Sequence, residues 1–449
     1  MNAPSRRGAC PALSAPMTTG DGLLVRLSPA GTIALGAFAD LCAAARTHGN
    51  GIVEVTARGS IQIRGLTAAS APAFARTVAP LGIDGGCHVS VIADPLAGLT
   101  PDAAIDAAVL AAAVRDALAV SAPTARLNPK VSVVIDAGTT WHLDAIAADV
   151  RLRAEPGRER PCLHFALGGD AAMAAPLGRV AAEDAAEAVT RLLTQIATHG
   201  RDARARDLVT GEGIGAFRAT VADLLVDAPA PPTRRPAAPI GAHRLRGGLL
   251  ARGLGLAFGH ADTTALSRFV VAARRAGASG IRAAPGRVLL VIGVTAETAD
   301  TLTAAADDLG FITRANDPRR HVAVCAGMPG CASAQIATRA LAPAIATAAA
   351  ALLDGSLTLH LSGCGKGCAH RPAAALTVVG ALGGCGVIVN GSARDQPLGT
   401  IVGQALPSRF AQLAREAERV RRSHERAAET LSRMGAARIL AILQEVGGA

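Results

Sequence analysis

Residues 51–66 read GIVEVTARGSIQIRGL, and residues 280–294 read GIRAAPGRVLLVIGV. In each stretch, two runs of mainly aliphatic residues flank a turn, which contains Gly59 in the first and Gly286 in the second. This pattern predicts a β-hairpin in both places. The two hairpins can be aligned at these glycines, so the chain is predicted to contain two related halves.

The elements around each hairpin repeat in the same order. Residues 22–27 (GLLVRL) predict a strand and residues 35–47 a helix, while residues 247–258 and 264–276 predict the corresponding pair in the second half. The segment DAPAPPTRRPAAPI at residues 227–240 separates the halves and is expected to be an extended, exposed linker. A strand–helix–hairpin order on both sides of this linker indicates an internal duplication.

A larger mixed segment follows each of these small units. Strands are predicted at residues 130–137, 321–326, 357–361, 375–379 and 387–390. Helices are predicted at residues 181–198 and 333–353. The charged tail at residues 408–446 has apolar residues at helical spacing, so we expect it to pack on the surface as a helix.

Composition excludes several classes of protein. Half of the 449 residues are hydrophobic, which is enough for a sizeable core. Aromatic residues make up 2%, so a nucleic-acid reader built on base stacking is not expected. The net charge of +10 is dispersed, and no apolar run is long enough for a membrane span. Because no secretory signal is recognisable, we expect a cytoplasmic protein with reduced thiols.

Four of the nine cysteines form an ordered pattern. Cys325 and Cys331 are separated by five residues in CAGMPGC, and Cys364 and Cys368 are separated by three in CGKGC. A [4Fe–4S] cluster needs four converging thiolates, and glycines in such loops let the backbone approach the sulfides closely. We predict that these four cysteines hold a [4Fe–4S] cluster.

Two other interpretations of the cysteines remain open. They could form a structural zinc site, although the spacing within a zinc ligand pair is usually about two to four residues. They could also be unrelated buried cysteines. The other five have no such spacing and are mostly expected to be small core residues: Cys10, Cys42, Cys87, Cys162 and Cys385.

Lysine is rare in this chain. Of the 45 basic residues, only Lys130 and Lys366 are lysines, and the rest are arginines. A compact ammonium differs chemically from a planar guanidinium, so a lysine retained against this bias can mark a chemical requirement. Lys130 lies in LNPKVSVVID, and Lys366 lies between the second pair of cysteines.

The cysteine order, the duplicated half and the stretch TARGSIQIRG (residues 56–65) resemble the sulfite and nitrite reductase superfamily. The resemblance covers about residues 10–400. The segments RRGACPALSAPMTTGDGLLVRL and LNPKVSVVID look most like one branch, the oxygenases of aerobic cobalamin biosynthesis. The implied fold is α+β and pseudo-two-fold, with duplicated ferredoxin-like half-domains and two mixed α/β lobes.

This resemblance divides the chain into six parts. The half-domains are expected at residues 1–90 and 241–310, and the lobes at residues 91–226 and 311–405. The second lobe would carry the iron–sulfur cluster and the tetrapyrrole site. The linker at residues 227–240 and a helical tail at residues 406–449 complete the division.

The resemblance also implies roles for single residues. The four patterned cysteines match the cluster ligands, and Cys368 matches the cysteine that also bridges to sirohaem iron. Side chains expected to hold macrocycle carboxylates are Thr56, Arg58 and Gln62, to which we add Arg64 and Lys366 as substrate contacts. Arg26 and Lys130 match an active-site arginine and an active-site lysine.

Several positions depart from the reductase pattern. Ser132 stands where the reductases have a second lysine, and Cys87 and His88 stand near the place of another substrate arginine. In the macrocycle strand, Glu54 replaces an arginine and Arg64 stands where histidine is frequent. Reducing a small anion needs several cations around it, whereas a large polycarboxylate needs dispersed arginines. These departures favour the oxygenase branch.

The implied reaction is the O2-dependent hydroxylation of precorrin-3A to precorrin-3B with lactone formation. It would use the [4Fe–4S] cluster and a second iron, held as sirohaem or as mononuclear iron, because hydroxylating an unactivated carbon requires a redox metal. Electrons would come from NADH or a ferredoxin through a partner protein. The alternatives are a sirohaem-dependent sulfite or nitrite reductase and a non-catalytic electron carrier.

Four histidines are further candidates for binding the second iron. They are His88, His321, His360 and His370. Taken singly, each is expected to be a core residue or to have ordinary hydrogen-bond partners.

Overall fold

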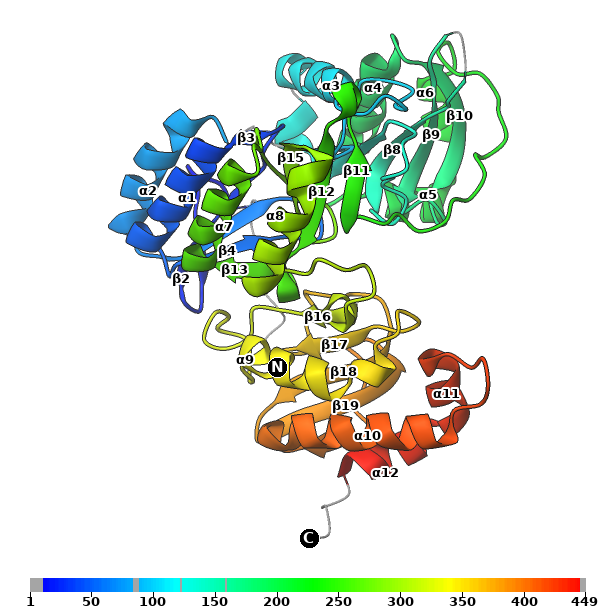
Figure 1. Cartoon of the computed structure of the whole chain (residues 1–449). Coiled ribbons are helices and arrows are strands. Elements are labelled where there is room, and N and C mark those ends of the chain that lie inside the picture. Colours follow the sequence, from blue (N-terminus) through cyan, green and yellow to red (C-terminus); the bar gives the residue numbers. More distant parts are fainter. Residues whose placement is uncertain (1–10, 84–88, 122, 158–159, 445–449) are drawn as a thin grey trace.

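The structure is a computed structural model that describes residues 11–83, 89–121, 123–157 and 160–444. It contains four five-stranded sheets, one for each half-domain and one for each lobe. In Figure 1 the half-domains lie at the left and centre, the first lobe at the upper right and the second lobe below. In the described part of the chain, none of the helices has both the length and the apolar character to cross a bilayer.

The first half-domain contains the predicted hairpin, with β4 (Ile52–Val55) and β5 (Ile61–Leu66) paired antiparallel. Its sheet order is β1-β2-β5-β4-β13. The outer strands are β1 (Met17–Thr19), β2 (Gly22–Leu27) and β13 (His260–Asp262). Helices α1 (Leu35–His48) and α2 (Ser70–Val78) accompany this sheet, followed by a short 3-10 turn, η1 (Ala79–Leu81).

The second half-domain repeats this arrangement, with sheet order β11-β12-β15-β14-β3. Its strands are β11 (Gly241–Arg244), β12 (Leu250–Gly255), β14 (Gly280–Ala284), β15 (Val288–Val294) and β3 (Ile33–Ala34). Its helices are α7 (Thr263–Arg275) and α8 (Ala296–Asp308), and 3-10 turns lie at η3 (Arg246–Gly248) and η4 (Ala257–Gly259).

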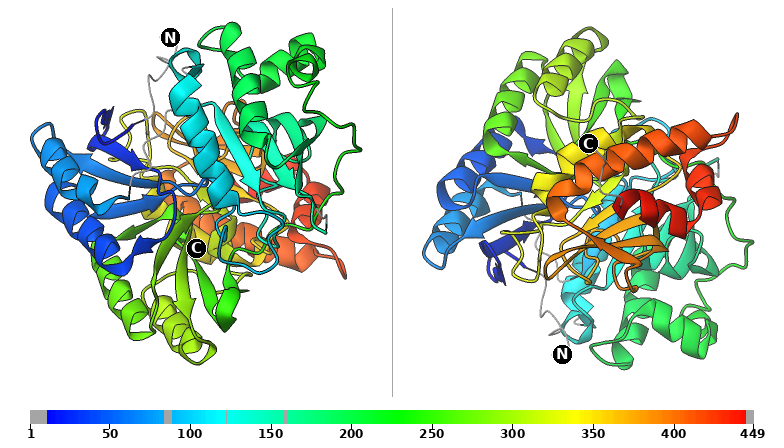
Figure 2. Two further views of the ribbon diagram at one scale, coloured as in Figure 1. Left: turned by 90° about the horizontal axis from the view of Figure 1, so that it is seen from above. Right: turned by 90° about the horizontal axis from the view of Figure 1, so that it is seen from below.

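The two half-domains exchange strands. β13 comes from the second half of the chain but pairs with β4, and β3 comes from the first half but pairs with β14. Helices α1 and α7 pack against each other, and one continuous apolar core contains Phe38 and Phe269. Figure 2 shows the two sheets side by side. The half-domains therefore form one packing unit.

The sequence predicted these hairpins well. In the first, Val55 pairs with Ile61, and Ile61 and Ile63 of β5 face the core as a half-buried strand requires, while the burial of Arg64 interrupts the alternation. In the second, Ala284 pairs with Val288 across the turn at Gly286. The two strands that follow the aligned glycines begin at Ile61 and Val288, which confirms the internal duplication.

The first lobe has sheet order β10-β9-β8-β7-β6. Its strands are β6 (Ser90–Ala93), β7 (Ser132–Asp136), β8 (Ala148–Ala154), β9 (Cys162–Gly169) and β10 (Ala175–Ala181). Its helices are α3 (Ala107–Ser121), η2 (Pro123–Arg126), α4 (Ala185–Thr198), α5 (Ala205–Glu212) and α6 (Gly215–Thr220).

The second lobe has sheet order β16-β17-β18-β19-β20. Its strands are β16 (Val322–Val324), β17 (Leu359–Ser362), β18 (Ala374–Ala381), β19 (Gly384–Gly391) and β20 (Gly399–Ile401). Its helices are η5 (Pro318–His321), α9 (Thr338–Ala348), η6 (Ala350–Leu352), η7 (Gly403–Ala405), α10 (Leu406–Val420), α11 (Ala427–Met434) and α12 (Ala436–Gln444).

The duplication extends to the lobes. In both, the first three strands are parallel and the last two are antiparallel additions. Ile92 pairs with Val134 in the first lobe as Ala323 pairs with His360 in the second. The loops from β7 to β8 and from β17 to β18 have the same length, so the two lobes can be aligned there without a gap.

Two predictions about the second lobe were wrong in detail. The helix predicted from residue 333 begins as α9 at Thr338, because residues 333–337 form a loop against Gly363. The tail is three helices, and their apolar residues, among them Phe410 and Leu413, belong to the core of the second lobe.

Candidate metal centre and active site

The two cysteine pairs follow neighbouring parallel strands of the second lobe. Cys325 comes directly after β16, and Cys364 comes shortly after β17. Val324 pairs with Leu361 at the end of these strands. Because the carboxyl ends of parallel strands meet at one edge of a sheet, both cysteine loops begin at the same place.

Direct contacts join the two loops. The backbone N–H of Gly363 donates to Sγ of Cys325 at 3.1 Å, and the N–H of Gln335 donates to the Gly363 carbonyl at 2.7 Å. Nζ of Lys366 donates to Oγ of Ser333 at 2.7 Å. A Cβ at Gly363 would lie 2.7 Å from Cβ of Ala334, so this approach requires glycine.

The chemistry of these thiols fits a metal cluster. None of the four forms a disulfide within the described residues; Cys368 is exposed and the other three are partly exposed. Backbone N–H groups of the kind that reaches Cys325 stabilise negative charge on sulfur. Cys42 differs, because burial raises the pKa of its thiol to about 12, and burial also raises the pKa of Cys385. Those two are core residues, as predicted.

Arg64 connects the first cysteine loop to the first half-domain. Its guanidinium is buried, forms two hydrogen bonds with the carboxylate of Asp21 at 3.0 and 3.1 Å, and donates to the carbonyl of Gly330, next to Cys331. The turn before Asp21 packs on the same loop, since a Cβ at Gly20 would meet the backbone of Cys331. These contacts favour a positioning role for Arg64 over the predicted substrate contact.

Glu54 makes a second connection of this kind. Its carboxylate lies 3.5 Å from Arg64 and 2.5 Å from Arg339, which belongs to α9 of the second lobe. Glu54 is buried, so the two guanidinium groups are needed to compensate its charge. Glu54, which replaces an arginine of the reductase pattern, therefore links the first half-domain to the second lobe through its ion pair with Arg339.

Arg58 connects the first half-domain to the first lobe. Its Nη1 donates to Oγ of Ser132 at 3.1 Å and its Nη2 to the carbonyl of Ala147 at 2.7 Å. Burial lowers the pKa of Arg58, and the charges of Arg204, Arg26 and Arg371 lower it further. Arg371 comes from the second lobe, so cations from three parts of the molecule converge around Arg58.

The other predicted site residues surround this cationic cluster or its strand. The Gln62 amide, oriented to satisfy its neighbours, accepts from Arg26 at 2.7 and 3.0 Å and donates to Glu54 at 3.0 Å. Oγ1 of Thr56 accepts the backbone N–H groups of Arg58 and Ser60 and so holds the hairpin turn. Lys130 is exposed in the turn before β7, which begins two residues later than predicted.

Sequence reasoning missed Arg204 and Arg371. Arg204 pairs with Asp149 through two contacts of 2.9 Å at the start of α5, and Arg371 lies just beyond the second cysteine pair. The position of Arg371 beside CGKGC was a signal for it. No local pattern marks Arg204, because its relation to Arg58 depends on tertiary packing.

In the first lobe, residues other than cysteine stand at the positions that align with the four cysteines of the second lobe. The N–H of Asp94 donates to the Ile135 carbonyl as that of Cys325 donates to the Leu361 carbonyl. Continuing this alignment through both loops places Thr100, Gly138 and His142 at the positions of the other cysteines. The first lobe thus lacks the thiols but keeps the backbone that carries them.

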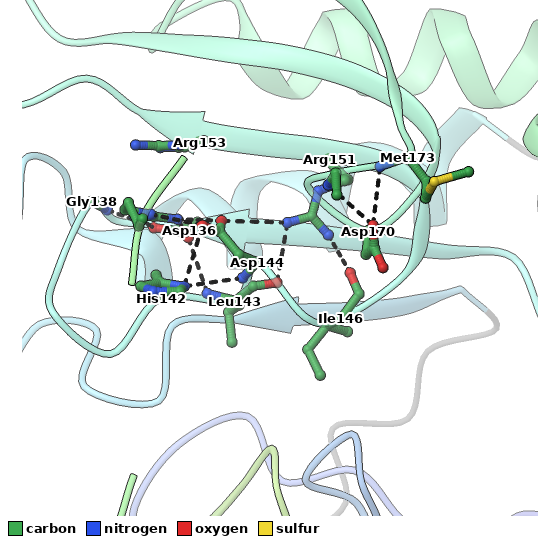
Figure 3. Close-up of polar contacts among 12 residues, drawn as sticks. Asp136, Gly138, His142, Leu143, Asp144, Ile146, Arg151, Arg153, Asp170 and Met173 are labelled. Carbon is green, nitrogen blue, oxygen red and sulfur yellow. Dashed lines mark hydrogen bonds and ion pairs between the residues drawn. The ribbon is translucent and has the colours of Figure 1, made fainter. Parts of the chain in front are cut away.

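A polar cluster of Asp136, His142 and Asp144 lies at this edge of the first lobe (Figure 3). Nη2 of Arg234, from the linker, lies 2.5 Å from a carboxylate oxygen of both Asp136 and Asp144. Although burial raises the pKa of Asp144, the hydrogen bonds and charge of Arg234 outweigh this effect and lower it overall. The guanidinium supplies the positive charge of this cluster, and the predicted linker is fixed to the first lobe.

One predicted histidine differs from expectation. His360 is fully buried, and neither ring nitrogen has a hydrogen-bond partner among the described residues, so it is not an ordinary satisfied core residue. Cys10, Cys87 and His88 lie outside the described residues.

Comparison with known proteins identifies the family. Residues 15–81 match the nitrite/sulfite reductase ferredoxin-like half domain. The chain is 40% identical over 443 residues to a precorrin-3B synthase from Sinorhizobium sp, covering 98% of this chain and 95% of that protein. The chain belongs to the precorrin-3B synthase family.

Relatives of this family within the reductase superfamily are more distant. A sulfite reductase [ferredoxin] of Mycobacterium tuberculosis is 29% identical over 181 residues, which is 37% of this chain and 33% of that protein. The structure of the Mycobacterium tuberculosis NirA protein matches with a TM-score of 0.74 and 22% identity, covering 93% of this chain and 84% of that one. This likeness confirms the predicted nitrite/sulfite reductase-like α+β fold.

Proposed function

We propose that this protein is a precorrin-3B synthase, which uses O2 to hydroxylate precorrin-3A and forms precorrin-3B with closure of a lactone. The observation that carries the proposal is the 40% identity to a precorrin-3B synthase over 98% of the chain. One atom of O2 enters the macrocycle and the other is reduced to water. The two electrons come from NADH or a ferredoxin through a partner protein.

In this proposal, Cys325, Cys331, Cys364 and Cys368 hold a [4Fe–4S] cluster. Their thiols, which form no disulfide within the described residues and lie on two contacting loops at one sheet edge, support this assignment. When bound, the cluster supplies single electrons to a second iron, sirohaem or mononuclear, which supplies the O2 chemistry. The zinc alternative predicts neither iron nor sulfide in the purified protein.

The cations around Arg58 would bind the acetate and propionate groups of the macrocycle. Guanidinium groups match carboxylates through parallel hydrogen bonds, and Arg26, Arg204 and Arg371 lie within electrostatic reach of Arg58. Lys130 and Lys366 add exposed ammonium groups, and Thr56 and Gln62 orient the arginines.

Ser132 supports the oxygenase over a sulfite reductase. The reductases are expected to have a second lysine here, but Ser132 is fully buried and accepts a hydrogen bond from Arg58. A serine cannot supply the charge that a small anion requires. Instead, Ser132 orients the guanidinium of Arg58.

The central experiment is anaerobic purification followed by turnover. We expect iron and sulfide in the ratio of a [4Fe–4S] cluster plus additional iron, and a product with one atom from isotopically labelled O2. Cys364→Ser should abolish the low-temperature EPR signal of the reduced cluster, whereas Cys162→Ser, a matched control, should retain it. Sulfite turnover by a sirohaem-containing protein without oxygenation of precorrin-3A would refute the proposal.

Arg58→Met tests the substrate site. Loss of a charge-assisted hydrogen bond of about 1.5–3 kcal/mol should weaken tetrapyrrole binding by about tenfold to a hundredfold. Binding can be followed by absorbance titration of the macrocycle under anaerobic conditions. Arg274→Met, which changes an exposed arginine of α7, should leave the Kd unchanged. An unchanged Kd in Arg58→Met would exclude Arg58 from the site.

A further inference from the structure

His360 is an unpartnered polar side chain inside the second lobe. It lies on β17, where Leu359 and Leu361 face the helix-covered core and His360 faces the opposite side of the sheet. Its relative exposure is 0%, and within the part of the chain that the structure describes both ring nitrogens lack a partner. Leaving such a group unpaired costs about 1–3 kcal/mol, so a bound group that pairs with it is expected.

The ring lies against the second cysteine loop. A Cβ at Gly367 would be 3.8 Å from Cε1 of His360, and Gly367 directly precedes Cys368. The ring centroid of His370 is 5.7 Å from that of His360. His360 is therefore packed between the sheet and the loop that carries two of the proposed cluster ligands.

The first lobe shows what this position contains when cysteines are absent. The residue there is Val134, which packs with Ile92, Leu143 and Ala148 in a small apolar cluster. In the second lobe Ala323 replaces Ile92 as the strand partner, and Ala369 occupies the position of Leu143 in the loop. Among the described residues of the two lobes, a histidine with smaller neighbouring side chains thus occurs at this position only in the lobe with the cysteine pattern.

Arg287 adds positive charge to the same region. It comes from the β14–β15 turn of the second half-domain, and its Nη2 donates to the Ala369 carbonyl at 3.4 Å. It has no acidic partner among the described residues, and burial lowers its pKa. Burial, then His370 and Arg287, lower the pKa of His360 to about 4, so its ring is neutral and can donate one N–H. This environment favours an anionic group over a second cation.

We infer that His360 and Arg287 tune the reduction potential of the cluster: His360 donates a hydrogen bond to a sulfide of the cluster, and Arg287 supplies uncompensated positive charge. The inference rests on the cluster assigned under the proposed function. Reduction adds one electron, taken from an external one-electron donor, to a centre that is already anionic. Donors and cations nearby stabilise the reduced state, and no bond to His360 forms or breaks.

His360→Val is the decisive variant because the first lobe already has valine at this position. We expect full iron and sulfide content but a more negative midpoint potential, with the equilibrium constant for reduction about tenfold lower, or 59 mV for one electron. His360→Gln keeps an N–H donor, so its midpoint potential should shift less than that of His360→Val. The measurement is an EPR-monitored redox titration of the full chain, with dithionite and mediators.

Two further variants complete the design. Arg287→Met removes the charge without touching the strand and should also make the potential more negative. His243→Gln changes a histidine that stacks on Trp141, away from the second lobe, and should leave the potential unchanged. If His360→Val fails to assemble the cluster, the midpoint potentials of Arg287→Met and His360→Gln test the inference instead.

Two results would overturn the inference. One is a wild-type potential in both His360→Val and Arg287→Met with the cluster intact. The other is the loss of one iron per chain from His360→Val with the cluster signal retained, because His360 would then be a ligand of a separate iron. Failure of the proposed function would instead appear in the wild type, as a missing cluster or missing oxygenation, so the two failures are distinguishable.

Discussion

Asp94 stands in the first lobe where the second lobe has Cys325. It is buried, its Oδ1 accepts the N–H of Leu96 at 2.8 Å, and Oγ1 of Thr139 donates to its Oδ2 at 2.5 Å. Burial outweighs these hydrogen bonds and raises the pKa of Asp94 to about 6. At neutral pH Asp94 is ionised, but ionising it in the folded protein costs more free energy than ionising it in the unfolded chain.

This raised pKa gives a testable pH dependence. The unfolded chain releases the proton near pH 4, whereas the folded chain retains it to about pH 6. Stability should therefore fall as pH rises from about 4 to 6, by about 3 kcal/mol at most, and stay level above that range. Asp94→Asn should remove this component and raise Tm at pH 8 relative to the wild type, with little difference at pH 4. An equal Tm difference at both pH values would contradict the assignment.

At the scale of elements, the first cysteine loop depends on another part of the chain. Arg64 on β5 and Gly20 in the β1–β2 turn both contact it, and Glu54 on β4 pairs with Arg339 on α9. The half-domain hairpin thus holds the loop between Cys325 and Cys331 from outside the second lobe. Strand β5, which is predicted to contact the macrocycle, therefore also positions the first cysteine loop of the proposed metal site.

Arg64→Met should weaken this support. Removing one partner of a buried ion pair costs about 3–5 kcal/mol, since Asp21 loses its partner. We expect a lower Tm and faster loss of iron to a chelator, with iron release followed by absorbance. Arg76→Met changes an exposed arginine of α2 and should behave as the wild type. Iron release at the wild-type rate would show that the loop does not need this anchor.

Some elements could be predicted from sequence and others could not, for physical reasons. The hairpin of β4 and β5 has two runs of mainly aliphatic residues and a glycine turn, both of which are local signals. Strands β3 and β13 have two and three residues, too few for a periodic pattern, so the strand exchange was not predicted. The delayed start of α9 at Thr338 depends on contacts with Gly363, which are distant in sequence.

In the candidate site, too, some features could be predicted from the sequence and others could not. The cysteine spacing predicted loops that do meet, through Cys325 and Gly363. The convergence of Arg204 and Arg371 on Arg58, and the lack of partners for His360, arise only when separate segments pack together. The roles of Arg26, Lys130 and Lys366 stay predictions.

At the scale of the whole molecule, the linker contacts the first lobe at several residues, of which Arg234 makes the ion pairs. Arg234 lies between Asp136, which is almost fully buried, and Asp144. Arg153 also donates to the Pro232 carbonyl at 2.7 Å, and His142 contacts the Arg235 carbonyl at 2.7 Å. The connection between the two halves is therefore tethered along its course.

Arg234→Ala should remove the closest cation from Asp136 and Asp144, and Arg151, 3.9 Å from Asp144, would compensate their charge only in part. We expect a loss of about 3 kcal/mol, within the range for breaking a buried pair, and faster proteolytic cleavage at residues 227–240. Thermal unfolding and limited proteolysis measure both effects. Arg235→Ala is the matched control, because only the backbone carbonyl of Arg235 makes the described contact with His142. Equal cleavage rates in the two variants would contradict the tethering role.

The reciprocal exchange of β3 and β13 means that neither half-domain has all of its strands without the other. Removing either half of the chain would turn β4 or β14 into an open sheet edge, which can pair with other chains. The loops beyond the parallel strands of the lobes lie outside this exchange. There the second lobe has four cysteines where the first lobe has Asp94, Thr100, Gly138 and His142.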